Sequence, residues 1–383
     1  MATGCDELAA LRPPNPKHPA EAELLRSRCR PGRTLTHVGV FLFVLGAALI
    51  GFTLVDALWT TIIPHGAGPL TSRVCRCLWF LAKRSPAPIR GHLLPAVGSL
   101  SLLAVIIAWV GLLWLGWWTL FSADPASILH GQSQTEANAW SRAYFTGFTL
   151  FTLGVGDYVP HGPVWQVATT LASFSGLFLI TLSITYLLPV LSAATEKRQL
   201  AVMIRDLGRD PTTLVVESWD GQGFDRLTQR LTTTIWPMIH LHVQRHLAYP
   251  VLHYFHSNRP GTSLAVGIAV LDEALLVIAH GVAEEARPRP WALAPTLRAI
   301  GSMLEVLETR FIRTAAEAPP IPETIGISSA GIPLADAQDF HRSIARATDR
   351  RRRLGGLVED AGWSWRDVRS PATDKISSEP PSK

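Results

Sequence analysis

Three long runs without a charged side chain constrain what this chain can fold into. They occupy residues 38–55, 91–123 and 158–195 and contain 18, 33 and 38 residues. An α-helix rises 1.5 Å per residue, so about 20 apolar residues are needed to cross a hydrocarbon core of about 30 Å. We therefore predict three membrane-spanning helices.

The charged residues are concentrated in the second half of the chain. Of 35 Lys and Arg and 30 Asp and Glu, only 12 basic and 8 acidic residues precede Thr195. This division excludes both a single soluble domain and a mostly disordered chain, and the mean hydropathy of +0.21 agrees with it. The net charge of +5 is small and scattered. We therefore expect a lipid bilayer, and not nucleic acid, as a partner.

A fourth apolar run, residues 264–282, contains the adjacent acids Asp272 and Glu273. At the centre of a span each carboxylate would cost about 2.5 to 3.5 kcal/mol on insertion scales. We therefore predict a buried helix of a soluble, mainly helical domain. Further helices are expected within residues 224–235, 297–311 and 335–353. The arginines at 350–353 are expected at a solvated helix end, with anionic lipid or an acidic partner as the alternative.

Residues 142–152 follow a polar loop with an apolar, aromatic stretch. After Arg142, about ten residues of helix cover only about 15 Å, which is half of the hydrocarbon core. Such a helix must enter the membrane and return to the same side. Backbone that is not helical at that depth is tolerated only where it is buried in protein or lines a watery path.

The returning segment begins with Thr-Leu-Gly-Val-Gly-Asp at residues 152–157. It resembles the pore loop of potassium channels, whose filter reads Thr-Val-Gly-Tyr-Gly-Asp. The resemblance implies an all-α membrane protein with an outer helix, a pore helix, a selectivity filter and an inner helix, here with an extra N-terminal span. It also implies a homotetramer around one pore, with potassium ions in the filter, no cofactor, no structural metal and no enzymatic activity.

Consecutive carbonyl oxygens of the filter replace a cation's water shell, and they point the same way only if the backbone angles alternate in hand. Glycine adopts φ > 0 without a steric cost, which suits Gly154 and Gly156. The residues that would form the filter are Thr152, Leu153, Gly154, Val155, Gly156 and Asp157, and Phe148 and Thr149 precede them on the pore helix.

Gly176 and Pro189 lie in the third span. In the family, the inner helix often carries a hinge glycine about twenty residues after the filter and a proline near its inner end. Glycine weakens a helix by about 1 kcal/mol and proline removes a hydrogen bond, so both are candidate bending points in gating. Close helix packing explains Gly176 equally well. Thr181 and Thr185 are expected on the face that lines the pore.

Leu153 and Val155 stand where the family has valine and tyrosine. The family's tyrosine hydroxyl bonds aromatic partners on the pore helix, so Val155 predicts a purely apolar cuff around the filter. Potassium selectivity, weak cation selectivity and a non-conducting membrane sensor with a degenerate filter all stay open. A remote alternative is an intramembrane aspartyl protease of the Gly-x-Gly-Asp type, in which Asp157 would need Asp56 as its second carboxylate. Otherwise Asp56 is expected near the membrane interface.

The resemblance puts the Asp157 end of the filter outside the cell and the C-terminal half in the cytoplasm, with the spans in the plasma membrane. Residues 64–92 carry five arginines and lysines and no acid, which fits a cytoplasmic loop. The arginines within residues 26–33 conflict with the outside position that three spans give the N-terminus, so its side stays open. Four tryptophans suggest an interfacial belt: Trp109, Trp114, Trp117 and Trp118.

These expectations divide the chain into six parts. They are a polar segment (1–35), an extra transmembrane helix (36–63), a basic loop (64–92), a pore domain (93–195), a helical cytoplasmic domain (196–369) and a disordered tail (370–383). Within the pore domain we expect the outer helix at 93–121, the pore helix at 142–152, the filter at 152–157 and the inner helix at 164–195.

Histidines stand out in the predicted cytoplasmic domain. Two pairs are one helical turn apart: His242 with His246, and His253 with His256. Each pair could face a metal ion or change charge near neutral pH, as a sensor would. Their aromatic and aliphatic neighbours favour structural histidines instead. No glycine motif for nucleotides is present, so the sequence does not identify a regulator of this domain.

Overall fold

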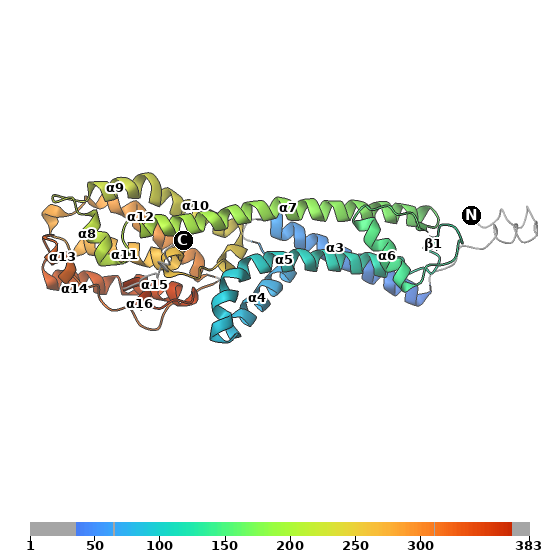
Figure 1. The fold of residues 1–383 in the computed structure, drawn as a ribbon, viewed down its shortest axis with the longest axis horizontal. Coiled ribbons are helices and arrows are strands. Elements are labelled where there is room, and N and C mark those ends of the chain that lie inside the picture. Colours follow the sequence, from blue (N-terminus) through green and yellow to red (C-terminus); the bar gives the residue numbers. More distant parts are fainter. Residues whose placement is uncertain (1–35, 64–65, 310, 370–383) are drawn as a thin grey trace, which may run out of the picture. The chain divides into compact units, whose positions relative to one another are not determined.

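The computed structural model describes residues 36–63, 66–309 and 311–369, which are mostly helical (Figure 1). The prediction of an all-α membrane protein with a helical soluble part is confirmed. The predicted polar segment 1–35 and disordered tail 370–383 lie outside the described residues.

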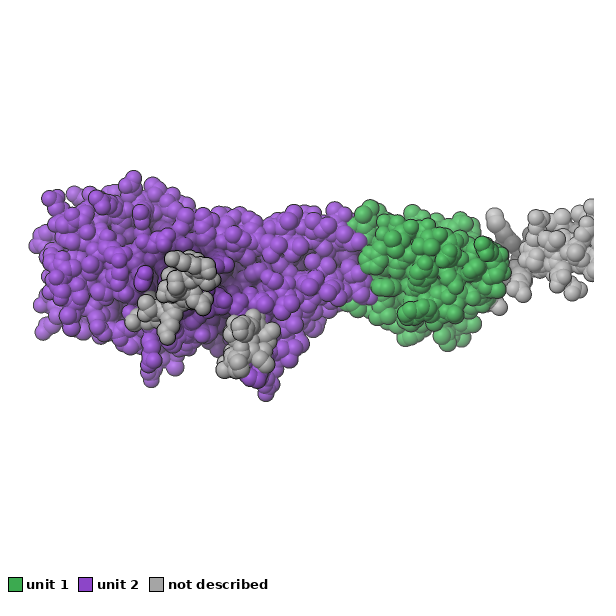
Figure 2. Space-filling view, viewed as in Figure 1, with its two compact units in different colours: residues 1–51, 112–177 green, residues 52–111, 178–383 purple. Residues whose placement is uncertain are grey.

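The chain forms two compact units, which Figure 2 colours separately. Unit 1 comprises Met1–Gly51 and Leu112–Leu177, and unit 2 comprises Phe52–Gly111 and Phe178–Lys383. Three long helices contribute residues to both units: α3 (His37–Ile62), α5 (Ala87–Phe121) and α7 (Pro163–Arg205).

These three helices are the ones among the described residues that are long and apolar enough to cross a membrane. The apolar part of α5 begins at Pro95. α7 does not end at residue 195 as predicted but continues to Arg205. Its last turns are charged and belong to unit 2, where they contact the soluble helices.

Within unit 1, α3 packs tightly against the second half of α5. A Cβ atom on Gly46 would lie 2.7 Å from the carbonyl oxygen of Gly116, and one on Gly116 would lie 2.9 Å from the side chain of Ile50. Small residues at such crossings let helix backbones approach closely. The indole Nε1 of Trp117 donates to Ser175 Oγ at 2.9 Å and so ties α5 to α7.

α4 (Pro69–Arg84) occupies most of the stretch for which a basic loop was predicted, so that prediction is wrong. Proline pre-sets the first turn of a helix, and the following residues contain no glycine or proline until Pro86. The basic residues of α4 are exposed, and so are Phe80 and Leu81. The segment is therefore a basic amphipathic helix in unit 2.

Asp56 of α3 caps the N-terminus of α4. Its Oδ1 accepts a hydrogen bond from the backbone N–H of Leu70 (2.8 Å), and its Oδ2 accepts one from the Thr71 hydroxyl (2.9 Å). The Trp109 indole also donates to Oδ2, at 2.9 Å. A Cβ atom on Gly68 would lie 2.2 Å from Oδ1, so glycine is required there. Asp56 and Trp109 are buried structural partners, and Trp109 is not part of an interfacial belt.

The soluble helices pack around α11 (Leu264–His280), whose residues from Leu264 to Ile278 are all buried, as predicted for this run. The predicted helix at 335–353 is broken at Ala347, and the one at 224–235 continues through a π-helical turn, η1 (Leu231–Ile235), into α10. The other helices are α8 (Pro211–Ser218), α9 (Asp225–Arg230), α10 (Trp236–Ala248), α12 (Pro290–Glu308), α13 (Ile325–Ser329), α14 (Ala337–Arg346), α15 (Thr348–Asp360) and α16 (Trp365–Arg369), with short 3-10 turns η2 (Pro250–Tyr254), η3 (Pro260–Thr262) and η4 (Glu284–Ala286).

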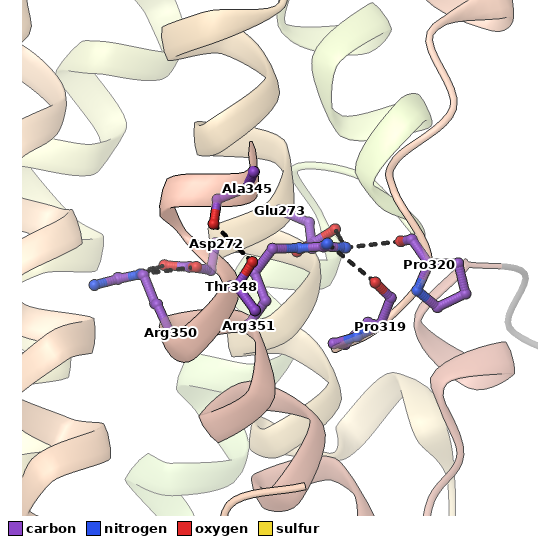
Figure 3. Close-up of polar contacts among 8 residues, drawn as sticks. All are labelled: Asp272, Glu273, Pro319, Pro320, Ala345, Thr348, Arg350 and Arg351. Atoms are coloured by element: carbon purple, nitrogen blue, oxygen red, sulfur yellow. Dashed lines mark hydrogen bonds and ion pairs between the residues drawn. The ribbon is translucent and has the colours of Figure 1, made fainter. Parts of the chain in front are cut away.

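The adjacent acids of α11 pair with adjacent arginines of α15 (Figure 3). Arg350 Nε lies 2.9 Å from Asp272 Oδ2, and Arg351 Nε lies 2.6 Å from Glu273 Oε1. Both carboxylates and Arg351 are buried. Residues 350–353 were predicted to form a solvated helix end. This prediction is wrong for Arg350 and Arg351, which pair with the two acids of the core.

Candidate functional site

α6 (Ala139–Leu150) is the predicted half-length helix. It begins before residue 142 because the Asn138 side chain accepts a hydrogen bond from the backbone N–H of Ser141 at 2.8 Å. Its 12 residues span about 18 Å, too little for a full crossing. Phe148 and Thr149, predicted on this helix, lie in its buried last turn.

Two tryptophans of α5 hold α6 in place. The indole Nε1 of Trp114 donates to the carbonyl oxygen of Ala143, and that of Trp118 donates to the carbonyl oxygen of Ala139, both at 2.9 Å. A Cβ atom on Gly147 would lie 2.8 Å from the Trp114 ring, so the two helices touch closely. These tryptophans therefore position the half-length helix, a role that their place in the sequence did not indicate.

The backbone after α6 alternates in hand. The φ angles of Thr152, Gly154 and Gly156 are +58°, +61° and +87°, and the residues between them do not have positive φ. The two glycines adopt the conformation that was predicted for them. Thr152 was not predicted to do so, and a left-handed non-glycine residue costs about 1 to 2 kcal/mol. The surroundings must therefore stabilise this conformation.

Hydrogen bonds to carbonyl oxygens in the last turn of α6 fix the start of this segment. The backbone N–H of Leu153 donates to the carbonyl of Phe148 at 2.8 Å, and that of Thr152 donates to the carbonyl of Thr149 at 3.1 Å. The C-terminal end of α6, where the helix dipole is partly negative, therefore leads directly into the alternating segment.

A short two-stranded antiparallel sheet fixes the other end of the segment. β1 (Ile128–His130) pairs antiparallel with β2 (Tyr158–Pro160), and the backbone N–H of Gly131 donates to the carbonyl of Asp157 at 2.8 Å. A Cβ atom on Gly131 would lie 3.1 Å from the carbonyl oxygen of Gly156, so this approach favours glycine. β1 lies in the stretch before α6 that was expected to be a polar loop, and β2 directly follows residue 157.

Tyr158 braces this sheet against α6. Its hydroxyl accepts a hydrogen bond from Ser141 Oγ at 2.9 Å, and its ring contacts Tyr144 edge-on with centroids 6.4 Å apart. A purely apolar cuff was predicted because Val155 has no hydroxyl. For Val155 this stays a prediction, but a tyrosine three residues further along makes a polar contact with α6 that was not predicted. The Tyr-Val-Pro sequence after residue 157 was the signal that could have indicated it.

Comparisons with known proteins bear on the same part of the chain. A family model described as "Ion channel" matches residues 102–193, which include α6, the alternating segment, most of α5 and much of α7. A relative from Bacillus subtilis (strain 168), titled "Uncharacterized membrane protein YdjJ", is 33% identical over 323 residues, which are 84% of this chain and 94% of the relative. The chain belongs to the family of this membrane protein. No solved structure matches it.

The ion-channel match ends within α7, where Gly176 and Pro189 were predicted as bending points. A Cβ atom on Gly176 would lie 2.2 Å from the carbonyl oxygen of Leu150, so close packing on α6 accounts for this glycine. Pro189 lies inside the helix, which continues on both sides of it. Thr181 and Thr185 are both exposed in the single chain. Bending and pore lining stay predictions.

The four predicted histidines come together in unit 2. His246 has ring centroids 5.9 Å from His242 and 6.1 Å from His253, and His253 lies 5.9 Å from His256. Burial, followed by the positive charge of Lys197, lowers the pKa of His242 and of His256 to about 3. These imidazoles are therefore neutral at pH 7. Among the described residues, no three His, Cys, Asp or Glu side chains are grouped so as to hold a metal ion.

Proposed function

We propose that the protein is a potassium-preferring cation channel and that four identical chains surround one filter formed by residues 152–157. The alternating backbone of this segment is the observation that carries the proposal: φ is positive at Thr152, Gly154 and Gly156 and not at the residues between. This alternation turns successive carbonyl oxygens toward one side of the strand, as replacement of a cation's water shell requires.

Electrostatics at both ends of the segment supports the same proposal. The partly negative C-terminus of α6 precedes it, and the carboxylate of Asp157 follows it. A permeating cation would gain from both. The plasma membrane would hold the three spans, and the helical domain after α7 would lie in the cytoplasm.

The exposure of the segment argues for assembly. In the single chain Leu153 is 70% exposed and Val155 is 50% exposed, although both follow a buried helix end. Non-helical backbone cannot face lipid, because its polar groups would lack partners. Neighbouring copies arranged around a central axis would cover these side chains and leave the carbonyl oxygens to the ions.

A weakly selective cation channel is the second candidate. Val155 supplies no hydroxyl beside the middle of the filter, and the Tyr158 brace acts at its outer end only. The protease alternative has little support, because both carboxylate oxygens of Asp56 are bound by the first turn of α4 and Trp109. A non-conducting sensor would show the same fold and is distinguished by recording.

The decisive experiment is a planar-bilayer recording of the purified protein with KCl on one side and NaCl on the other. We expect a cation current whose reversal potential favours potassium, and native mass spectrometry should find four chains. A reversal potential near zero at equal concentrations, together with a shift toward the cation equilibrium potential in a KCl gradient, would indicate the weakly selective channel. Absence of current in every condition, or a reversal potential set by chloride, would contradict the proposal of a cation channel.

Gly156→Ala tests the filter itself. Its φ of +87° disfavours any residue with a Cβ by roughly 1 to 2 kcal/mol, and a tetramer carries that strain four times. We expect loss of current or of potassium preference. Gly51→Ala is the matched control, because a Cβ on Gly51 meets no atom within 4 Å in a regular helix. Unchanged currents in both variants would mean that ions do not pass this segment.

A further inference from the structure

A cavity of about 700 Å³ lies in unit 2 where the last turns of α7 meet the soluble helices. Its walls come from α7, α10, α12, α15 and the segment after η2, and the four clustered histidines face it. Ligand pockets in proteins have volumes of about 300 to 1,000 Å³, so this cavity has the size of a binding site for a small molecule.

The histidines on this wall have hydrogen-bonding capacity that the protein does not use. His246 is only 4% exposed, and neither of its ring nitrogens has a hydrogen-bond partner among the described residues. Nδ1 of His256 is likewise buried without a partner there. Buried polar atoms are normally paired, so these imidazoles point to a ligand that can accept their N–H groups.

The charges around the cavity favour an anion. The Lys197 ammonium donates to the carbonyl oxygens of Leu252 (3.1 Å) and Phe255 (2.8 Å). Both acceptors are uncharged, so these hydrogen bonds do not neutralise the positive charge of Lys197. Arg198 adds a second positive charge to the wall. The one acid in the wall, Asp360, is already paired.

Two contacts occupy the Asp360 carboxylate. Its Oδ1 lies 3.1 Å from Lys83 Nζ, and its Oδ2 lies 3.1 Å from His253 Nε2. The neutral imidazoles add N–H donors without adding an opposing charge. A negatively charged group would therefore find both a positive field and unpaired donors.

Part of the remaining wall is apolar, beside polar side chains at Thr195, Ser257, Asn258, Thr262 and Ser263. The apolar side chains are those of Leu191, Met303, Leu307 and Leu357. One water molecule occupies about 30 Å³ in the liquid, which is far less than the volume of this cavity. An inorganic ion alone would leave most of this surface without a partner. We propose that the cavity binds a small anionic amphiphile, in which a carboxylate or phosphate group carries an aliphatic chain.

The headgroup would lie against His246, His256 and Lys197, and the chain would lie against the leucines and Met303. A free metabolite and an anionic lipid share this chemistry. The occupant would contact α7 through Leu191 and Lys197, on the helix proposed to line the pore. Binding itself does not depend on ion conduction, so it can be tested whether or not the protein carries current.

Isothermal titration calorimetry of the full chain in phosphatidylcholine nanodiscs tests the proposal, with the heat from empty nanodiscs subtracted. Octanoate is the probe, and octylammonium and inorganic phosphate separate the contributions of charge and chain. We expect saturable octanoate binding, with octylammonium and phosphate each at least tenfold weaker. No octanoate binding, or equal binding of octylammonium, would overturn the proposal.

His246→Phe should weaken octanoate binding at least tenfold, because it removes the buried N–H donor and keeps an aromatic ring. His240→Phe is the matched control, since His240 is an exposed residue of the same helix, and it should bind like the wild type. Equal affinities in the two variants would contradict the assignment.

Photolabelling keeps the test independent of how the variants fold. A diazirine analogue of octanoate should label wild-type peptides from α7, α10 and α15, and octanoate should block that labelling. Labelling confined to other peptides would refute the site. Nanodiscs that contain phosphatidylglycerol identify the source: lower octanoate affinity there means that a lipid headgroup competes for the cavity, and unchanged affinity means that the occupant is a free anion.

Discussion

At the scale of single residues, the buried charges of α11 show how one segment can be apolar and still belong to a soluble domain. Asp272 and Glu273 interrupt a run long enough to cross a membrane, and each meets one arginine of α15 (Figure 3). The Arg351 guanidinium also donates hydrogen bonds to the carbonyl oxygens of Pro319 (3.0 Å) and Pro320 (2.7 Å). Buried ions persist only when partners satisfy them in this way.

Arg351→Met should destabilise the helical domain strongly, because it leaves Glu273 buried without its partner. Breaking a buried pair from one side costs about 3 to 5 kcal/mol, whereas replacing both members with apolar residues can be neutral. We expect hydrogen exchange of the full chain to show this loss as faster opening of α11. The double variant Glu273→Leu with Arg351→Met should recover most of it.

Arg342→Met is the control for this prediction. Arg342 pairs with Asp339 on the surface, where both side chains are more than 60% exposed. Such a pair contributes at most about 1 kcal/mol. If Arg351→Met changes exchange no more than Arg342→Met does, the buried pair does not stabilise the domain.

At the scale of elements, the segment 152–157 is held by short pieces that a pattern of long helices does not indicate. The β1–β2 sheet has three residues in each strand, yet the Gly131 amide beside it fixes the carbonyl of Asp157, and Tyr158 connects the sheet to α6. With Tyr158, both ends of the segment 152–157 are therefore connected to one helix, α6.

Tyr158→Phe should loosen this brace while keeping the ring. The lost hydrogen bond from Ser141 contributes about 1 kcal/mol per chain. Exchange of the Gly131 amide, which is bonded to Asp157, should become faster, and the potassium preference of any current should fall. Tyr144→Phe is the control, because the ring of that half-exposed residue contacts Tyr158. An unchanged exchange rate of the Gly131 amide in Tyr158→Phe would show that the hydroxyl does not stabilise this part of the structure.

At the scale of the whole molecule, the helical domain keeps several histidines neutral in its interior. Burial lowers the pKa of His246 and His253 as well as that of His242 and His256. In the unfolded chain a histidine has a pKa of about 6.5. Folding and protonation of these residues are therefore coupled.

The sign of the coupling predicts acid sensitivity. Above about pH 6.5 both states are neutral, and below it the unfolded chain binds protons that the folded chain does not. Stability should then fall by up to about 1.4 kcal/mol per pH unit for each buried histidine, a loss that continues toward pH 3 for His242 and His256. Lys197, Arg245 and Lys83 oppose protonation in the folded chain, and Asp360 favours it at His253.

Thermal unfolding of the full chain in nanodiscs between pH 7 and pH 5 measures this loss. His256→Phe keeps the stack on Trp79 and should reduce the pH slope by about 1.4 kcal/mol per unit. His341→Phe, on the exposed side of α14, should leave the slope unchanged. A slope equal in all three proteins would contradict the prediction.

The sequence by itself determined the spans, the half-length helix and the positive φ of the two glycines that follow it. Each of these depends on local properties: the length of an apolar run, the rise of a helix and the ability of Gly154 and Gly156 to adopt positive φ. The same local patterns failed where a residue's partner is distant in the chain.

Only the tertiary structure decided those partners. Trp109 meets Asp56 across 53 positions and Arg351 meets Glu273 across 78. The histidines form the wall of a cavity only because α7, α10 and α15 meet there. The sequence pattern around a polar side chain is the same whether that side chain is solvated, caps a helix or pairs with a charge. Its role depends on which other segments bury it and supply its partners.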